Sequence, residues 1–139
     1  MEEQIKEFIK NHTIQIGSRA FDLHNEESDY DYVMTKNNAH EFVKLLEDKK
    51  FNMIILDDYD VQGKSILPME NLVVIKFDMD GYKYEILVYE ENEFLYFIQI
   101  NKMMREILTK PEYFQKLKNK KKRVLVYNNL MKIIFSLNK

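Results

Sequence analysis

The feature that most constrains the fold is a pair of alternating apolar stretches in residues 71–89, joined by Asp80 and Gly81. An Asp-Gly pair suits a type I′ turn, whose twist matches that of two antiparallel strands. Because such a turn has two residues, it fixes the register and places Lys76 opposite Glu85. We therefore predict a hairpin with one apolar face and one charged face.

The rest of the chain alternates between the periodicities of helices and strands. Apolar residues at helical spacing predict helices in residues 2–11 and 37–50. Alternating or continuous apolar runs predict three more strands, in residues 13–16, 29–34 and 51–56. A polar segment, residues 57–68, is expected to form a loop. Together these elements predict an α+β fold with a small mixed β-sheet and helices on one face.

A length of 139 residues suits a single domain. We expect residues 1–91 to form the part of the domain that carries the site. Helical spacing returns from residue 92 and breaks at Pro111, because proline cannot continue a helix from the turn before it. Residues 92–139 are therefore expected to form a helical C-terminal extension of the same domain, with two or three helices.

Charge is distributed unevenly along the chain. Residues 1–101 hold ten Lys and Arg against 21 Asp and Glu, whereas residues 102–139 hold eleven against two. A basic tail of this kind is typical of a solvated helix face or of a surface that docks on acidic groups, and also of a contact to a nucleic-acid backbone. Its densest run comprises Lys118, Lys120, Lys121, Lys122 and Arg123.

Cysteine is absent, which excludes disulfides, zinc–thiolate sites and a cysteine nucleophile. A chain without cysteine is typical of a reducing compartment, so we expect a cytoplasmic protein. No apolar run reaches the length of a membrane span, and the first residues lack the order of charges and apolar residues found in a signal peptide. We expect no contact with a membrane.

The stretch that carries chemistry begins with Gly17 and Ser18, directly after a predicted strand. Glycine allows backbone N–H groups to approach a ligand closely, and a helical turn that starts there favours an anion such as phosphate. After ten intervening residues, Asp29 and Asp31 share one face of the next predicted strand. Two carboxylates at this spacing suit Mg²⁺, and a triphosphate held at Ser18 would present its α-phosphorus to a hydroxyl. The stretch therefore predicts nucleotidyl transfer.

The pattern Gly-Ser-x10-Asp-x-Asp after a strand resembles the signature of the DNA polymerase β-type nucleotidyltransferase superfamily. Gly-Ser-Arg-Ala-Phe followed by Glu-Ser-Asp-Tyr-Asp-Tyr is similar to small predicted nucleotidyltransferases of bacteria and their phages, some of them associated with RNA repair. A helix with an Asn soon after the third-carboxylate strand is also typical of that group, and Asn101 begins a loose version of it. The resemblance implies a polymerase β-like fold, a nucleoside triphosphate as substrate and Mg²⁺, with two ions expected.

The resemblance also implies roles for single residues. Gly17 and Ser18 would contact the nucleotide phosphates, Arg19 would lie close enough to help with a phosphate, and Asp29 and Asp31 would ligate Mg²⁺.

The superfamily needs a third carboxylate, on a later strand of the same sheet, which orients a metal and accepts the proton of the attacking hydroxyl. We predict Glu85 for this role, because it lies on the charged face of the hairpin in the strand before the helical extension. Asp78 shares that face and is the rival. In the structural alternative the two acids only pair across the hairpin, with Lys76 and Lys83 respectively.

We expect the chain to transfer a nucleoside monophosphate from a nucleoside triphosphate to an acceptor hydroxyl and to release pyrophosphate. The basic tail favours an RNA end as acceptor, with tRNA a reasonable candidate. One alternative keeps the chemistry but modifies a protein hydroxyl, as in the minimal nucleotidyltransferase antitoxins. Another is a non-catalytic module of a phage or bacterium that keeps the fold and binds a nucleotide or a protein.

Overall fold

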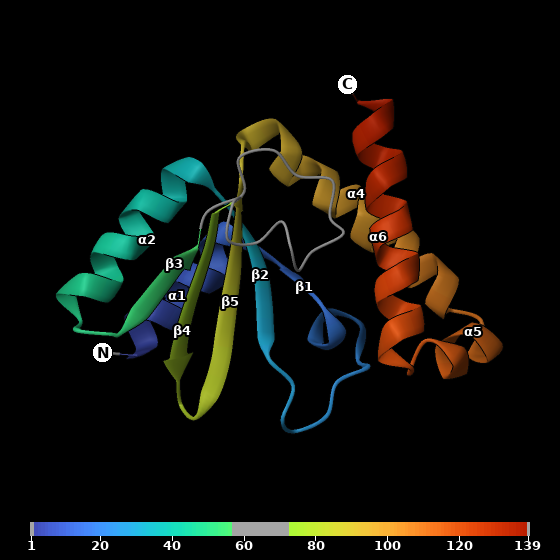
Figure 1. The fold of residues 1–139 in the computed structure, drawn as a ribbon, viewed down its shortest axis with the longest axis horizontal. Helices are drawn as coiled ribbons and strands as arrows, with labels where there is room; N and C mark the ends of the chain where they lie inside the picture. Colours follow the sequence, from blue (N-terminus) through green and yellow to red (C-terminus); the bar gives the residue numbers. More distant parts are fainter. Residues whose placement is uncertain (1, 57–72, 139) are drawn as a thin grey trace.

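The computed structural model describes residues 2–56 and 73–138 and shows an α+β fold (Figure 1). The first half of the chain forms α1 (Glu2–His12), β1 (Thr13–Ile16), the short 3-10 helix η1 (Ser18–Phe21), β2 (Tyr30–Thr35), α2 (Lys36–Asp48) and β3 (Met53–Leu56). The second half forms β4 (Val73–Met79), β5 (Tyr82–Tyr89), α4 (Glu91–Leu108), α5 (Pro111–Lys116) and α6 (Lys120–Leu137). The predicted loop at residues 57–68 lies outside the described residues.

The five strands form one mixed sheet in the order β1-β2-β5-β4-β3. Strands β2 and β5 are parallel, and the other neighbouring pairs are antiparallel. The predicted hairpin register is confirmed, since Lys76 lies opposite Glu85 and Asp78 opposite Lys83. Asp80 has a φ of 56° and Gly81 one of 80°, as a type I′ turn requires. The sheet thus has the mixed character that the sequence predicts.

Helices α1 and α2 cover one face of the sheet, and α1 lies behind the strands in Figure 1. Ile5 and Ile9 of α1 and Phe42 of α2 are buried there, at positions that recur on one side of each helix. The strands contribute alternate residues to this cluster, because successive side chains point to opposite faces. Its buried strand residues are Met34, Ile75, Phe77, Met79, Tyr84, Ile86 and Val88.

The helical extension packs on the other face of the sheet. Val33, Val74 and Leu87 lie on this second face and are buried with residues of α4 and α6. Helices α4 and α6 pack side by side, with Phe97 and Met131 buried in the same cluster. The hairpin face predicted to be charged therefore also carries buried apolar residues, Val74 and Leu87, which α4 and α6 cover.

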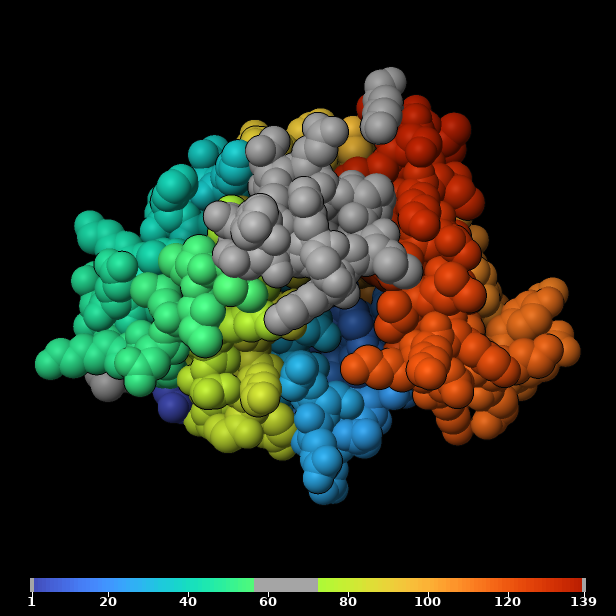
Figure 2. All heavy atoms as spheres, viewed as in Figure 1, coloured from blue at the N-terminus to red at the C-terminus, as the bar shows by residue number. Residues whose placement is uncertain are grey.

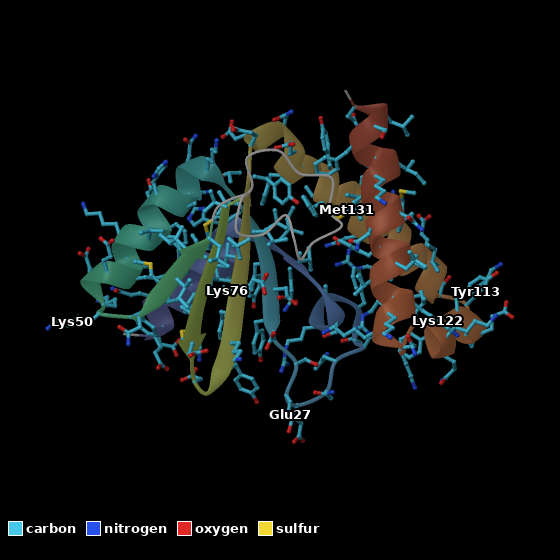
Figure 3. All side chains as sticks on the ribbon, viewed as in Figure 1. Glu27, Lys50, Lys76, Tyr113, Lys122 and Met131 are labelled. Carbon is cyan, nitrogen blue, oxygen red and sulfur yellow. The ribbon has the colours of Figure 1, made fainter. Side chains whose placement is uncertain are left out.

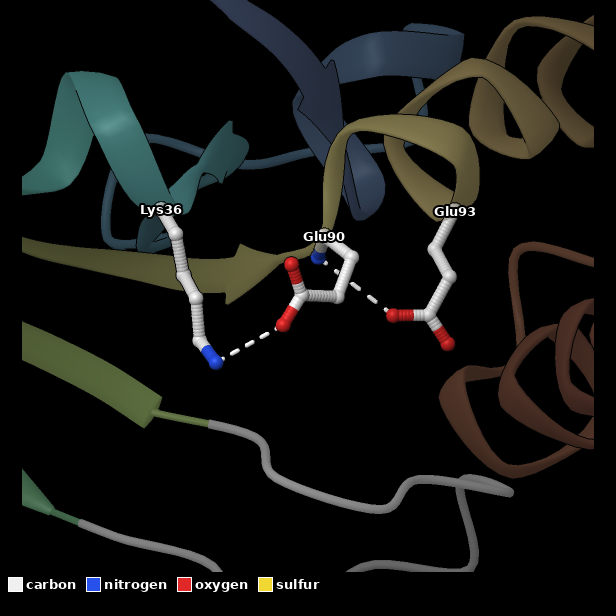
Figure 4. Close-up of polar contacts among 3 residues, drawn as sticks. All are labelled: Lys36, Glu90 and Glu93. Atoms are coloured by element: carbon white, nitrogen blue, oxygen red, sulfur yellow. Dashed lines mark hydrogen bonds and ion pairs between the residues drawn. The ribbon is translucent and has the colours of Figure 1, made fainter.

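Helices α2 and α4 begin at the same end of the sheet, because each follows one of the two parallel strands. Thr35 caps α2, and its hydroxyl accepts a hydrogen bond from the backbone N–H of Asn38. Glu90 and Glu93 form a capping box at the start of α4. An ion pair of 2.7 Å between Lys36 Nζ and Glu90 Oε1 joins the two helix starts (Figure 4). Across residues 2–56 and 73–138, no helix combines the length and apolar character that a membrane span needs.

Candidate active site

Gly17 lies against the carboxylate of Asp31. Strand β1 pairs antiparallel with β2, so Ile16 is the partner of Asp31 and Gly17 follows at the edge of the pair. Gly17 has a φ of 75°, and a Cβ built on it would overlap Asp31 Oδ2. Only glycine therefore allows this backbone conformation and this approach at once. The first and last parts of the predicted motif meet here.

Asp31 and Glu85 are partners on adjacent strands, because the parallel pairing of β2 and β5 aligns them. Asp29 lies just before β2 and acts on Asp31 through its charge. Burial raises the pKa of Asp31 to about 7, with the nearby charges of Glu85 and Asp29 adding to the rise. Lys120 acts in the opposite direction and lowers it. The three predicted carboxylates thus lie close enough to disfavour ionisation of the central one.

The rival acid, Asp78, lies farther from the motif. It pairs with Lys83 near the hairpin turn on β4, and β5 separates β4 from β2. Among the described residues, neither Lys76 with Glu85 nor Asp78 with Lys83 forms an ion pair within 4.0 Å, so the structural alternative gains no direct contact. Glu85 is the acid of the hairpin that the sheet places next to Asp31.

The donor set of this face fits Mg²⁺. The three carboxylates supply oxygen ligands, which Mg²⁺ prefers. Asp31 is partly buried and forms no ion pair with any described residue, and a buried carboxylate between two others is relieved by a bound cation. In the described ranges, however, no three Asp, Glu, His or Cys side chains are gathered tightly enough to form a finished metal cluster. A Mg²⁺ ion held by all three carboxylates would require their side chains to turn towards one point.

Ser18 and Arg19 start η1, at the end of β1. The Ser18 carbonyl accepts a hydrogen bond of 3.0 Å from the backbone N–H of Leu23, which closes the turn. Arg19 Nε and Nη2 donate to the Ser28 carbonyl at 3.2 and 3.0 Å. The Arg19 guanidinium lies 3.9 Å from the ring centroid of Tyr30. Tyr30 points to the face opposite Asp31, so the structure does not bring the Arg19 guanidinium to the carboxylates.

The start of α6 lies near the carboxylates, since the charge of Lys120 acts on Asp31. Figure 3 shows Lys122 at the lower end of α6 and Glu27 at the tip of the loop before β2. The basic tail is exposed here except for Arg123, which is partly buried and donates to the Leu117 carbonyl at 3.3 Å. In Figure 2, atoms of the β1 and β2 region lie at the surface between the hairpin and this end of α6. Lys120 is thus the residue of the basic tail whose charge acts on the carboxylates.

Asn101 holds the extension to the strand that precedes the motif. It is 2% exposed, and its Nδ2 donates to the Gln15 carbonyl at 2.9 Å. Its Oδ1 accepts a hydrogen bond of 2.7 Å from the Tyr127 hydroxyl. One side chain of α4 thus links β1 to α6. The sequence suggests Asn101 through the resemblance, but it shows neither partner.

We predict that Asn101→Ala lowers the free energy of unfolding by about 3 kcal/mol, because two hydrogen bonds are lost and the Gln15 carbonyl and the Tyr127 hydroxyl lose their partner. Urea unfolding measures the change. Gln99→Ala, on the exposed side of the same helix, is the control and should change stability by less than about 0.5 kcal/mol. Equal losses in the two variants would contradict the role of Asn101 as a link.

Sequence reasoning missed the parallel pairing of β2 with β5 and the proximity of Lys120 to Asp31. The first has no local signal, because the helix and strands between β2 and β5 leave several strand orders open. For the effect of Lys120 on Asp31, the sequence offers only the run of basic residues at 118–123 as a signal.

Comparison with known proteins gives no family for this chain. No family model and no curated protein matches the sequence. Two solved structures are similar. They are the Cid1 poly(U) polymerase, with 14% sequence identity and a TM-score of 0.46, and a cytoplasmic RNA terminal U-transferase, with 14% identity and a TM-score of 0.47. Each match covers 76% of this chain, and this chain spans about a third of each of those polymerases, 33% and 32% respectively.

Proposed function

We propose that this chain is a Mg²⁺-dependent nucleotidyltransferase that moves a nucleoside monophosphate from a nucleoside triphosphate to an acceptor hydroxyl. The observation that carries the proposal is the pairing of Asp31 with Glu85 on adjacent parallel strands, where Gly17 lies against the Asp31 carboxylate. Asp31 and Glu85 are 54 residues apart in the sequence, yet they occupy partner positions on two neighbouring strands.

The reaction follows from the chemistry of these groups. The acceptor oxygen forms a bond to the α-phosphorus, the bond from that phosphorus to the β-phosphate oxygen breaks, and pyrophosphate leaves with the bonding electrons. Glu85 accepts the proton of the acceptor hydroxyl. Asp29, Asp31 and Glu85 would hold the metal, and Gly17 and Ser18 would contact the phosphates through backbone N–H groups. Bound Mg²⁺, with two ions expected, supplies stabilisation of the entering and leaving oxygens.

The acceptor that we propose is the hydroxyl of an RNA end, with tRNA included. The support is electrostatic. Lys120 lies near Asp31, and the neighbouring lysines of the basic tail are exposed at the same end of α6. Exposed lysines attract phosphate without reading sequence, so they suit the backbone of an RNA acceptor. Lys118, Lys120, Lys121 and Lys122 make up this exposed set.

The test is incorporation of label from each α-³²P-labelled nucleoside triphosphate into RNA and into protein of a bacterial lysate, with Mg²⁺ present. We predict that Glu85→Gln lowers the transfer rate by about 100-fold, because a glutamine cannot accept the hydroxyl proton. Asp78→Asn is the matched control on the same face of the hairpin, and its rate should stay within about twofold of the wild type.

The outcomes separate the candidate functions. Label in RNA supports the proposed acceptor, whereas label only in protein would replace it with a protein hydroxyl. Label in neither fraction, with nucleotide binding intact, would overturn the enzymatic proposal in favour of a binding module. Equal rates for Glu85→Gln and the wild type would remove Glu85 from the mechanism.

A further inference from the structure

We infer that a second groove, on the face of the sheet opposite the carboxylates, binds a nucleotide unit, meaning a nucleobase with its phosphate. The groove lies between α1, β1, β2 and the hairpin and has a volume of about 610 Å³. Cavities of this size hold small ligands in other proteins. We call it the tyrosine groove, and the residues that line it include Lys6, Lys10, Gln15, Tyr30, Tyr32 and Tyr84.

The rings of the tyrosine groove are nearly parallel. Tyr30 stacks on Tyr84 with 4.8 Å between the ring centroids and 8° between the planes. Tyr32 is inclined to Tyr84 by 9°, with 6.3 Å between the centroids. The Arg19 guanidinium covers one side of Tyr30, 3.9 Å from its centroid, and Phe77 stacks on Tyr84 with 5.1 Å between the centroids. A planar base in the groove would therefore stack on Tyr32, and stacking of a base on an aromatic side chain is a strong and sequence-tolerant contact. The rings therefore favour a nucleobase over an aliphatic ligand.

Polar groups of the tyrosine groove lack partners within the described part of the chain. Tyr84 is only 7% exposed, yet its hydroxyl forms no hydrogen bond with a described residue. The Gln15 side-chain amide, which also lines the groove, forms none either. Buried polar groups nearly always bond to protein or to ordered water, so a polar ligand that enters the groove can replace water on these two groups. The heteroatoms of a base or ribose can accept and donate such bonds.

The charge of the tyrosine groove fits a phosphate. Lys6 and Lys10 lie one turn apart on α1 and both line the groove. Lys6 Nζ forms an ion pair of 2.8 Å with Asp80 Oδ2, whereas Lys10 forms no ion pair with a described residue. One ammonium group thus remains for an anion beside the aromatic rings. Stacked rings together with an uncompensated ammonium group match a nucleotide better than a neutral aromatic or an acidic peptide.

This inference goes beyond the proposed function, because it uses none of the carboxylates. Tyr30 and Tyr32 flank Asp31 in β2 but point to the opposite face. The ligand comes either from a free nucleotide or from a nucleotide of a single-stranded RNA, which offer the same chemistry.

The experiment measures binding to the full chain in EDTA, so that metal-dependent binding at the carboxylates does not contribute. The probes are a fluorescent single-stranded RNA decamer of mixed sequence, followed by anisotropy, and the four nucleoside monophosphates, followed by calorimetry. The test variants are Lys10→Glu, which is exposed, and Tyr32→Leu. The matched controls are Lys44→Glu on α2 and Tyr113→Leu on α5, both exposed and outside the groove.

We expect each test variant to weaken binding by about tenfold and each control to leave it unchanged within about twofold. Tight binding of the decamer that both test variants weaken and that monophosphates do not displace assigns the groove to an RNA strand, because a decamer held by the basic tail would not respond to these variants. Binding of monophosphates alone, weakened by the same variants, assigns the groove to a free nucleotide. Absence of binding by both probes, or equal affinities for Lys10→Glu and Lys44→Glu, would overturn the inference. The binding assay needs no turnover. A protein that binds through this groove but transfers no nucleotide would therefore contradict the proposed function and leave this inference intact.

Discussion

Asp31→Asn is expected to make the metal-free protein more stable at about pH 8 while it lowers nucleotidyl transfer by about 1,000-fold. The gain in stability follows because the Asp31 carboxylate is buried beside Glu85 and Asp29, where its negative charge costs free energy. An uncharged amide of the same shape removes that cost. The loss of activity follows because an amide neutralises none of the charge on Mg²⁺, and several kcal/mol of transition-state stabilisation depend on a correctly held ion.

The sign of the pH dependence follows from the direction of the shift. The pKa of Asp31 is raised from 3.8 to about 7 in the folded protein, so the folded state binds the proton more tightly than the unfolded state. The contribution of Asp31 to the free energy of unfolding is therefore nearly complete at about pH 4, is lost as the pH rises towards about 7, and stays absent above that value. The full loss is on the order of 4 kcal/mol. Asp31→Asn should lack this loss, so the two proteins should differ little at about pH 4.

Thermal unfolding at several pH values, with and without Mg²⁺, measures both parts of this prediction. Mg²⁺ should raise the Tm of the wild type at about pH 8 and leave that of Asp31→Asn nearly unchanged, because only the wild type binds the ion through this carboxylate. Asp78→Asn, on the outer part of the same face, should follow the wild type in both respects. A Tm for Asp31→Asn below that of the wild type at about pH 8 would contradict the electrostatic argument.

The parts of the fold that local chemistry determines could be predicted from the sequence. Asp80 and Gly81 fix the turn, and the register from Lys76 opposite Glu85 onward follows from the turn length alone. The end of α4 and the start of α5 follow from Pro111, which occupies the first turn of α5. These features depend on contacts between residues that are near neighbours in the chain or across one turn.

The parts that depend on distant pairing could not be predicted in this way. The placement of Glu85 beside Asp31 needs the parallel pairing of β2 with β5, which the sequence between them does not specify. Arg19 illustrates a second limit. Its position in the motif favours a phosphate contact, but the Ser28 carbonyl and the Tyr30 ring hold its guanidinium on the other face. The role of Arg19 in phosphate binding stays a prediction.

Gly17→Ala is expected to lower the free energy of unfolding by about 3 kcal/mol and to abolish transfer in the protein that still folds. Gly17 has a φ of 75° and a ψ of −167°, a region that only glycine adopts without strain. The added methyl group would also overlap Asp31 Oδ2. Because the carboxylate and the Gly17 backbone cannot both keep their positions, the loss of stability and the loss of the proposed metal ligand have one cause.

Gly81→Ala is the matched control for this prediction. Gly81 also has a positive φ, of 80°, but a Cβ built there would meet no atom within 4 Å. That variant isolates the cost of the backbone conformation, about 1 kcal/mol, and should leave activity unchanged. The difference between the two glycines in urea unfolding measures the contact with Asp31. Asp31→Ala removes the carboxylate that the added methyl group meets. In that background, the losses of stability caused by Gly17→Ala and Gly81→Ala should therefore become more nearly equal. Equal costs at the two positions would show that Gly17 does not hold its place against the Asp31 carboxylate.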